Sequence, residues 1–550
     1  MVANNSKYSS TRYHDTSSRE FFSFEEVVLK GLASDGGLFH PHKVPNIRAQ
    51  FVEWKDLSFP ELAYRVMRLY IDEHEISNEE LKSIVDRSYS TFRHPDTVPL
   101  VTLDDKKDLH LLELFHGPTF AFKDVALQFL GNLFEFFLVR KNEKLEQGQP
   151  RHHLTVIGAT SGDTGSAAIY GLRGKKDVSI FIMFPDGKVS PVQEAQMTTV
   201  LDPNVHCLSV QGTFDDCQDY VKALFADPET NKIHRLAAVN SINWARILAQ
   251  ITYYFYAYFQ LLKRKPNLKQ AKFVVPTGNF GDILAGYYAQ RMGLPVAKLV
   301  IATNENDILH RFWQTGSYSK TPKPAEEERE GIKADGAQAH EDAVKETYSP
   351  AMDILVSSNF ERLLWHLGLE HELELNPHVK CETSLRVAGS KINGWFQELK
   401  AAGSFTVDDD ILGKAKEIFG TYRVSNEETL EAIRDCYRGE AISKRGYILD
   451  PHSAIGVAAS LREIAASGPS DVPTVSLATA HPAKFAGAVE LALKDEKGFD
   501  FNTVLPEQFV GLGDKERKVL KVSSSEGLPG IRQTITTEVE KEKEARQNGF

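Results

Sequence analysis

The segment HGPTFAFKDVALQF places Lys123 between Phe122 and Asp124, among further apolar side chains. An apolar surround lowers the pKa of an amine, so a desolvated lysine can attack an aldehyde as a Schiff-base lysine must. Isolated lysines are mostly solvated, however, and a surface lysine at the start of an amphipathic helix fits the same residues. The segment alone leaves both interpretations open.

The segment FVVPTGNFGDILAGY predicts a strand, a glycine-containing turn and then a helix. Glycines let backbone N–H groups crowd around an anion at the helix N-terminus. The segment lacks the Lys-Ser/Thr of a nucleoside triphosphate loop and the spacing of a dinucleotide fingerprint. A lone phosphate monoester is the better prediction, although a simple chain reversal also explains the turn. The residues concerned are Gly278, Asn279, Phe280, Gly281 and Asp282.

Two further polar loops offer anion ligands. In GATSGDTGSAA, Thr160, Ser161 and Thr164 present hydroxyls at a helix start, which suits a carboxylate or a second phosphate. A simple helix cap is the alternative there. In AVNSINWARI, amide, hydroxyl and guanidinium groups gather within seven residues and predict an oxyanion clamp. That clamp consists of Asn240, Ser241, Asn243 and Arg246.

The segment VSLATAHPAKF ends a predicted strand at Thr479 and continues with His481 and Lys484. A hydroxyl at a strand end can meet the ring nitrogen of a ligand. A threonine that caps the following helix is an equally good interpretation of this segment alone.

Short apolar runs followed by polar turns and helical stretches position these motifs from about Leu154 onward, a pattern typical of βαβ units. Several runs are continuously apolar, which predicts an α/β fold with parallel sheets covered by helices on both faces. Ligands bind such sheets at the carboxyl ends of the strands. The stretch from Ser23 to about Pro99 instead has helical periodicity and predicts a small, largely helical unit.

Two segments are poor in large apolar residues. Residues 321–347, TPKPAEEEREGIKADGAQAHEDAVKET, predict a solvated insertion, and the final EVEKEKEARQNGF predicts a frayed helical tail.

The chain has 550 residues, a formal net charge of -11 and a pI of about 5.9. Its length predicts two to four domains, and its charge makes nucleic acid and acidic membranes poor partners. The four cysteines have no zinc-ligand spacing, so we expect reduced thiols and no metal site. No secretory signal or membrane span is evident, which favours a cytoplasmic protein.

Six segments occur together, in an order that resembles the threonine synthases of the fungal and bacterial type: HGPTFAFKD, GATSGDTGSA, NSINWARI, PTGNFGD, DPHSAIG and TAHPAKF. The stretch SFEEVVLKGLASDGGLFHP is similar to the first domain of that family, and the resemblance covers roughly residues 20–515. Two departures are Tyr13, where the family often has glycine, and Ser453, where it usually has threonine.

The resemblance implies a fold-type II pyridoxal-phosphate enzyme, with two parallel or mixed sheets wrapped by helices and a small, mostly helical N-terminal domain. Lys123 would be catalytic and carry pyridoxal 5'-phosphate, the loop from Gly278 to Asp282 would hold the cofactor's phosphate, and Thr479 would face its pyridine nitrogen. The expected substrate-binding residues are Ser161, Asp163, Thr164, Asn240, Ser241, Asn243 and Arg246.

The implied reaction converts O-phospho-L-homoserine and water to L-threonine and phosphate. A phosphohomoserine lyase or a serine or threonine dehydratase remains the alternative, and a non-catalytic cofactor-binding protein a remote one. We expect a monomer or weak homodimer. The expected domains are 1–98 at the N-terminus, 99–132 with 243–515 as the large cofactor-binding domain, 133–242 as a smaller α/β substrate subdomain, and 516–550 as a tail.

Overall fold

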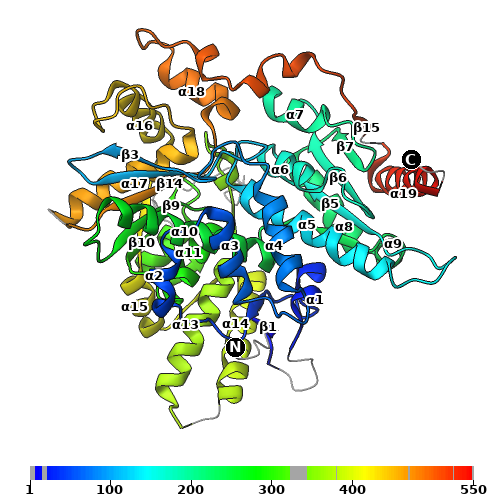
Figure 1. The fold of residues 1–550 in the computed structure, drawn as a ribbon, viewed down its shortest axis with the longest axis horizontal. Helices are drawn as coiled ribbons and strands as arrows, with labels where there is room; N and C mark the ends of the chain where they lie inside the picture. The colour runs from blue at the N-terminus through cyan, green and yellow to red at the C-terminus, as the bar shows by residue number, and fades with distance from the viewer. Residues whose placement is uncertain are drawn as a thin grey trace, which may run out of the picture.

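The computed structural model describes residues 7–14, 21–321, 344–378, 381–468, 471–523 and 525–547. Most of the predicted insertion, residues 322–343, lies outside them. Two sheets lie side by side with helices packed around both, as the sequence predicted (Figure 1). Within the described residues, no helix is long and apolar enough to cross a membrane.

The N-terminal part is largely helical, as predicted. Its helices begin sharply because serines and glutamates form reciprocal capping boxes, for example Ser23 with Glu26 and Ser77 with Glu80. A two-stranded antiparallel sheet pairs residues 8–10 with residues 39–41. The elements are β1 (Tyr8–Ser10), α1 (Phe24–Lys30), β2 (Phe39–Pro41), α2 (Phe51–Trp54), α3 (Phe59–Arg68) and α4 (Asn78–Tyr89).

The larger sheet has the strand order β13-β10-β9-β14-β4-β3, and its neighbours are parallel except for the antiparallel pair of β3 and β4. Alternate residues of β9 enter different cores: Phe273 and Val275 join the main one, whereas Val274 packs with Ile455 of α17 (Pro451–Ser467). Helices therefore cover both faces. The strands are β3 (Leu100–Asp104), β4 (Leu109–Glu113), β9 (Ala271–Pro276), β10 (Val296–Thr303), β13 (Phe419–Arg423) and β14 (Thr474–Ala478).

The smaller sheet is entirely parallel, in the order β15-β7-β6-β5-β8. Its strands are β5 (Leu154–Ala159), β6 (Val178–Pro185), β7 (Val205–Val210), β8 (Leu236–Ala238) and β15 (Leu520–Val522). The helices that follow them are α6 (Asp163–Leu172), α7 (Pro191–Thr198), α8 (Phe214–Ala226) and α9 (Pro228–His234).

The C-terminal segment is part of this second unit, and its prediction as a separate frayed tail is wrong. Strand β15 pairs with β7, and α19 (Gly527–Gln547) buries Ile531, Ile535 and Val539 in the core beneath the sheet. Each such side chain contributes about 1.5–3 kcal/mol when fully buried. The spacing of these three residues on one helical face was the available signal, but the many charges between them obscured it.

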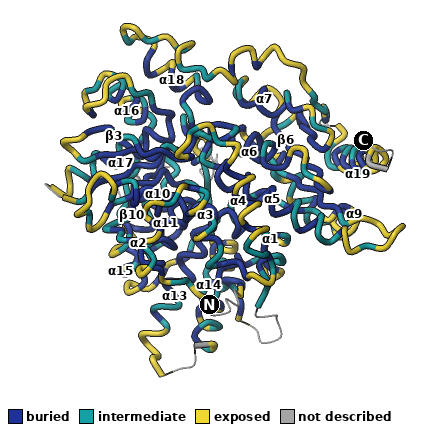
Figure 2. The backbone as a smooth tube through the Cα atoms, viewed as in Figure 1, coloured by how far each residue is buried: buried dark blue, intermediate teal, exposed yellow. Residues whose placement is uncertain are grey.

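Helix α5 (Lys123–Asn142) lies between the two sheets and is buried over most of its length (Figures 1 and 2). It touches α6 so closely that a Cβ added at Gly131 would lie 1.9 Å from the carbonyl oxygen of Gly171. The two helices are therefore held together by a tight backbone contact at Gly131.

The remaining helices wrap the larger sheet. Helices α13 and α14 pack against each other, and their far ends, toward residue 378, are exposed in Figure 2. The remaining elements are α10 (Trp244–Arg264), α11 (Gly281–Arg291), α12 (Ile308–Thr315), β11 (Ser317–Ser319), α13 (Phe360–Leu375), α14 (Cys381–Ala402), β12 (Ser404–Thr406), α15 (Asp409–Ile418), α16 (Asn426–Arg438), α17 (Pro451–Ser467) and α18 (Ala486–Leu493).

Candidate active site

The predicted motifs lie in the loops that follow β4, β5, β8, β9 and β14, at the carboxyl ends of parallel strands, as expected for such sheets. Two of them are joined directly. The Phe122 N–H donates to the Thr479 carbonyl at 2.7 Å, and Ala121 forms a bridge with Ala480. The turn that carries Lys123 is therefore attached to the end of β14.

Lys123 is the first residue of α5 and only 7% exposed. Burial lowers the pKa of its amine; Asp163 opposes that shift, whereas Lys484 and Arg246 add to it. The solvated-lysine alternative is wrong, because the side chain lies in a buried cluster of charges. Burial favours the neutral form of this amine, which is the form that acts as a nucleophile or base.

Asp163, the first residue of α6, lies between two buried ammonium groups. Its Oδ2 is 3.4 Å from Lys123 Nζ, and its Oδ1 is 2.7 Å from Lys484 Nζ. Burial alone would raise the pKa of this carboxyl, but the two lysines outweigh burial and hold the pKa below its usual range. Asp163 therefore carries a negative charge beside Lys123.

The loop from Gly278 to Gly281 is tightly held by the segment before α13. Ser357 Oγ donates to the Gly278 carbonyl at 2.7 Å, and the Asn359 N–H donates to the Asn279 carbonyl at 3.0 Å. Phe280 adopts a left-handed conformation with φ 62°, and its ring packs against Trp313, Phe360 and Phe419.

No side chain caps the start of α11, so its first N–H groups are available to an anion. The arrangement suits a phosphate group. We call Gly278–Gly281 together with the start of α11 the backbone cradle.

The predicted phosphate loop ends at Asp282, whose side chain has other partners. Its Oδ1 accepts hydrogen bonds from the Tyr253 and Tyr254 hydroxyls at 2.5 and 2.9 Å, so the carboxyl group faces α10. Burial raises the pKa of this carboxyl to about 6, and the two tyrosines lower it only in part. Any contribution of Asp282 to an anion site runs through its backbone N–H.

Arg246 lies in the first turn of α10 and is only 5% exposed. Among the described residues no carboxylate forms an ion pair with it, and its Nε has no hydrogen-bond partner. Burial lowers the pKa of this guanidinium to about 10, which leaves it charged at neutral pH. A buried, unpaired cation is costly unless an anion joins it, so the geometry predicts an anionic ligand here.

Asn240 and Ser241 lie beside Arg246 in the chain, at the end of β8. The Asn240 Oδ1 is buried without a partner, and the Ser241 Oγ lies 3.0 Å from the Ser358 Oγ. Asn243 is different, because its amide caps α10 at the Ala245 N–H and donates to the Val28 carbonyl. Its side chain thus has structural partners at both ends. We call Asn240, Ser241 and Arg246 the side-chain cradle.

The hydroxyls of the GATSGDTG loop are less enclosed. Ser161 is exposed and Thr164 is partly exposed. Thr160 is buried and accepts hydrogen bonds from the Gly162 and Gly165 N–H groups at 2.9 Å, so it stabilises the turn itself. Ser161 and Thr164 remain predicted substrate residues at the outer edge of the site.

Thr479 is buried, and its Oγ1 has no partner among the described residues. Its backbone is held from both sides, because its N–H donates to Ser453 Oγ at 3.1 Å and its carbonyl accepts from Phe122. Ser453 in turn donates to Asp450, the cap of α17. Ser453 thus presents a hydroxyl at the position where the resemblance predicted a threonine. An orphaned hydroxyl in a fixed position suits a ring nitrogen.

The sequence analysis assigned no role to two residues that the structure brings into this site. Ser358 Oγ lies within 3.1 Å of both Ser241 Oγ and Asn279 Oδ1 and so links the two cradles. Lys484 forms the second ion pair of Asp163. Its position five residues after Thr479, in TAHPAKF, was the available signal.

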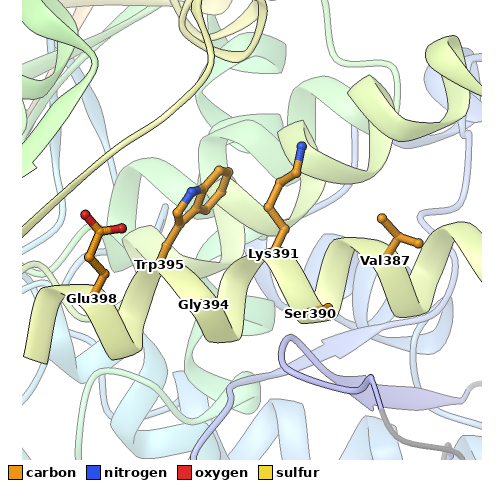
Figure 3. Close-up of a pocket in the computed structure, with 6 residues that line it drawn as sticks. All are labelled: Val387, Ser390, Lys391, Gly394, Trp395 and Glu398. Carbon is orange, nitrogen blue, oxygen red and sulfur yellow. The ribbon is translucent and has the colours of Figure 1, made fainter. Parts of the chain in front are cut away.

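Surface grooves elsewhere do not compete with this site. The groove in Figure 3 runs along one side of α14 and is lined by Val387, Ser390, Lys391, Gly394, Trp395 and Glu398. The described residues that line it include none of the predicted site residues, and the charged ones among them are Lys391 and Glu398 on the same helix.

Comparisons with known proteins agree with the geometry. The family models "Threonine synthase N terminus", "Pyridoxal-phosphate dependent enzyme" and "Threonine synthase, C-terminal" match residues 7–89, 96–355 and 453–535. The threonine synthase of Schizosaccharomyces pombe is 56% identical over 527 residues, which cover 95% of this chain and 97% of that protein.

Two crystal structures extend the likeness to the fold. That of threonine synthase from yeast has a TM-score of 0.88 and 51% identity, and covers 98% of this chain and 99% of that chain. A threonine synthase from Brucella melitensis with bound pyridoxal phosphate has a TM-score of 0.80 and 38% identity, and covers 97% and 99% of the two chains. The chain therefore belongs to the threonine synthase family of pyridoxal-phosphate-dependent enzymes.

Proposed function

We propose that the enzyme converts O-phospho-L-homoserine and water into L-threonine and phosphate, with pyridoxal phosphate held by Lys123. The observation that carries the substrate assignment is Arg246, a buried guanidinium with no carboxylate partner among the described residues. A plain hydroxy amino acid offers only its α-carboxylate, which the hydroxyls at the start of α6 suit, and so brings no second anion to Arg246. A phosphorylated one supplies the missing anion, because guanidinium and phosphate form two parallel charge-assisted hydrogen bonds.

The site also fits the cofactor. The unpartnered Thr479 hydroxyl suits its ring nitrogen, the uncapped start of α11 suits its phosphate, and the buried Lys123 suits its aldehyde. When bound, pyridoxal phosphate supplies an electron sink that makes protons on the substrate's carbon chain acidic. Thr479 would be a neutral partner for the ring nitrogen, and such a partner would restrain that sink and disfavour transamination.

The residues of the chain would then have separate roles in the reaction. Lys123, freed as an amine when substrate binds, would take the Cα proton and later return one, a role for which burial favours its neutral form. Between these two steps a Cβ proton and the phosphate leave, Cγ gains a proton, and water adds its hydroxyl at Cβ. Arg246 holds the substrate phosphate and neutralises the charge that grows on it as it leaves from Cγ. Asn240 and Ser241 orient the same group.

One assay tests the proposal against its alternatives. Purified enzyme is incubated with O-phosphohomoserine, and threonine, 2-oxobutyrate and phosphate are measured separately. Threonine and phosphate in equal amounts support the synthase. Phosphate with 2-oxobutyrate in place of threonine identifies a lyase, and the absence of all three refutes an enzyme acting on this substrate.

We also propose that the enzyme acts in the cytoplasm, as a monomer or weak homodimer. The absence of a membrane-spanning helix among the described residues is compatible with this location, and the net negative charge opposes tight self-association. Cell fractionation tests the location, and sedimentation at several protein concentrations tests the oligomeric state.

A further inference from the structure

A second lysine lies in the site, more deeply buried than the first. Lys484 is 1% exposed and belongs to the short turn Pro482–Phe485 that follows β14. Its Nζ lies 2.7 Å from Asp163 Oδ1, donates to the Thr119 carbonyl at 2.8 Å and lies 3.5 Å from Ser166 Oγ. These contacts occupy its three N–H groups, so Lys484 has no donor left for a substrate.

Among the described residues, Asp163 is the residue whose carboxylate contacts both Lys484 and Lys123. The two oxygens of this carboxylate are divided between the two amines, Oδ1 toward Lys484 and Oδ2 toward Lys123. Gln193 adds a 3.3 Å hydrogen bond to Oδ1 and so supports the same orientation. Without Lys484, the carboxylate could turn both oxygens toward Lys123.

The charged groups around this chain of contacts come from several elements. Arg246 of α10 and Lys484 act on Lys123, His452 of α17 acts on Asp163, and Asp124 of α5 interacts with Lys484. The Asp124 carboxyl group accepts hydrogen bonds from the Thr119 N–H and hydroxyl, so it is already engaged. Asp163 is the residue that contacts both lysines.

We propose that Lys484 is a positioning residue that fixes the orientation and charge of Asp163 and thereby sets the proton affinity of Lys123. The inference rests on the proposed attachment of the cofactor to Lys123. Lys484 disfavours a proton on Lys123 in two ways: it draws one carboxylate oxygen away, and it adds a like charge nearby. Since a single carboxylate lies between the two amines, the charge of Lys484 should shift the pKa of Lys123 by about one to two units.

The test follows the visible absorption band of the cofactor-loaded enzyme as a function of pH, without substrate, together with the pH profile of kcat/KM. In Lys484→Met, the midpoint of the absorbance change should move up by about one pH unit or more, because a proton on the Lys123 nitrogen becomes easier to hold. The midpoint of the acidic limb of the kcat/KM profile should move up in the same variant. Lys484→Arg keeps the charge and should restore most of the midpoint.

A second variant must move the midpoint in the opposite direction. Asp163→Asn removes the negative charge but leaves both amines, so a proton on Lys123 becomes harder to hold and the midpoint should fall. Lys518→Met is the matched control, since Lys518 is a half-buried lysine that donates to the Val205 carbonyl in the smaller sheet. It should leave the midpoint unchanged.

An unchanged midpoint in Lys484→Met, or shifts of the same sign in Lys484→Met and Asp163→Asn, overturns the proposal even where activity falls. Should Lys484→Met not fold, Asp163→Asn and Lys484→Arg decide: the first must lower the midpoint and the second must leave it near that of the wild type. The titration uses no substrate. An enzyme that shows these shifts but forms no threonine therefore refutes the proposed function and not this inference.

Discussion

The two anion cradles of the site are built in opposite ways. In the backbone cradle, the donors are the N–H groups of Gly278–Gly281 and the start of α11, and the side chains only hold the loop in place. In the side-chain cradle, the donors are the guanidinium of Arg246 and its polar neighbours, carried on the first turn of α10 and the loop before it. Ser358 joins the two.

The difference suits a permanent ligand and a transient one. Backbone donors are fixed by the fold and carry no full charge, so they hold an anion without an unpaired cation when it is absent. A buried guanidinium without a partner is costly until its anion arrives, and it then provides a strong, planar contact. The backbone cradle therefore suits the cofactor's phosphate, and the side-chain cradle suits a phosphate that binds and leaves in every cycle.

The largest effect is expected at Lys123, the residue to which we propose that the cofactor attaches. Lys123→Ala should abolish turnover and the covalent attachment of the cofactor, while both cradles remain intact. Borohydride reduction followed by peptide mapping measures the attachment. A reduced adduct on Lys484 would contradict the prediction, because it would show that the second buried amine can replace the first.

Removing Arg246 should affect the side-chain cradle alone. Loss of a charge-assisted contact to a desolvated anion costs on the order of 2–5 kcal/mol, so kcat/KM for phosphohomoserine should fall by a factor of tens to thousands in Arg246→Ala. Cofactor affinity should stay near that of the wild type. Arg246→Lys should recover only part of the loss, because an ammonium group lacks the planar fork.

Cofactor affinity and steady-state kinetics on both arginine variants provide the measurement. Weak cofactor binding in Arg246→Ala would show that the side-chain cradle holds the phosphate of the cofactor. Normal use of phosphohomoserine by that variant would remove Arg246 from the site.

A smaller effect is expected at Gly278, where a substitution should weaken cofactor binding instead of the use of substrate. An added Cβ would lie 3.0 Å from the Ala351 carbonyl oxygen, a backbone atom that cannot move alone, so Gly278→Ala should displace the backbone cradle at a cost of about 1–3 kcal/mol. Cofactor affinity should fall about tenfold, while kcat at saturating cofactor changes little. Equilibrium dialysis of the cofactor measures this.

Gly413→Ala is the matched control for the glycine variant, because an added Cβ at Gly413 meets no atom within 4 Å. Equal losses of cofactor affinity in the two variants would show that the effect is not local to the cradle.

The sequence indicates a backbone cradle more directly than it indicates a side-chain cradle, for a physical reason. Glycines after an apolar strand indicate a close backbone approach directly, and the predicted parallel sheets follow from continuously apolar runs. Side-chain partners depend on contacts far apart in the chain. Asn243 turned out to cap α10, and Lys484 meets Asp163 across more than three hundred residues, which local patterns do not indicate.

Asp282 tests whether the backbone cradle relies on backbone groups alone, because this residue lies next to the cradle and yet its side chain faces away from it. Asp282→Asn should keep cofactor affinity and kcat/KM within a few-fold of the wild type, since the carboxyl group contacts Tyr253 and Tyr254 instead of the anion. A large loss of cofactor affinity would show that the side chain, and not the backbone, contributes to the cradle.

The same variant should change how stability depends on pH. Burial raises the pKa of Asp282 to about 6, well above that of an unfolded aspartate, so the folded enzyme keeps this proton longer than the unfolded chain does. The stabilisation is fully present below about pH 4 and is lost as the pH rises through 6, a change of about 2–3 kcal/mol. Asparagine does not titrate. The free energy of unfolding of Asp282→Asn relative to the wild type should therefore increase by about that amount between pH 4 and pH 7, as measured by urea unfolding. A difference that stays constant over this range would mean that the two tyrosines keep the carboxylate ionised in the folded enzyme.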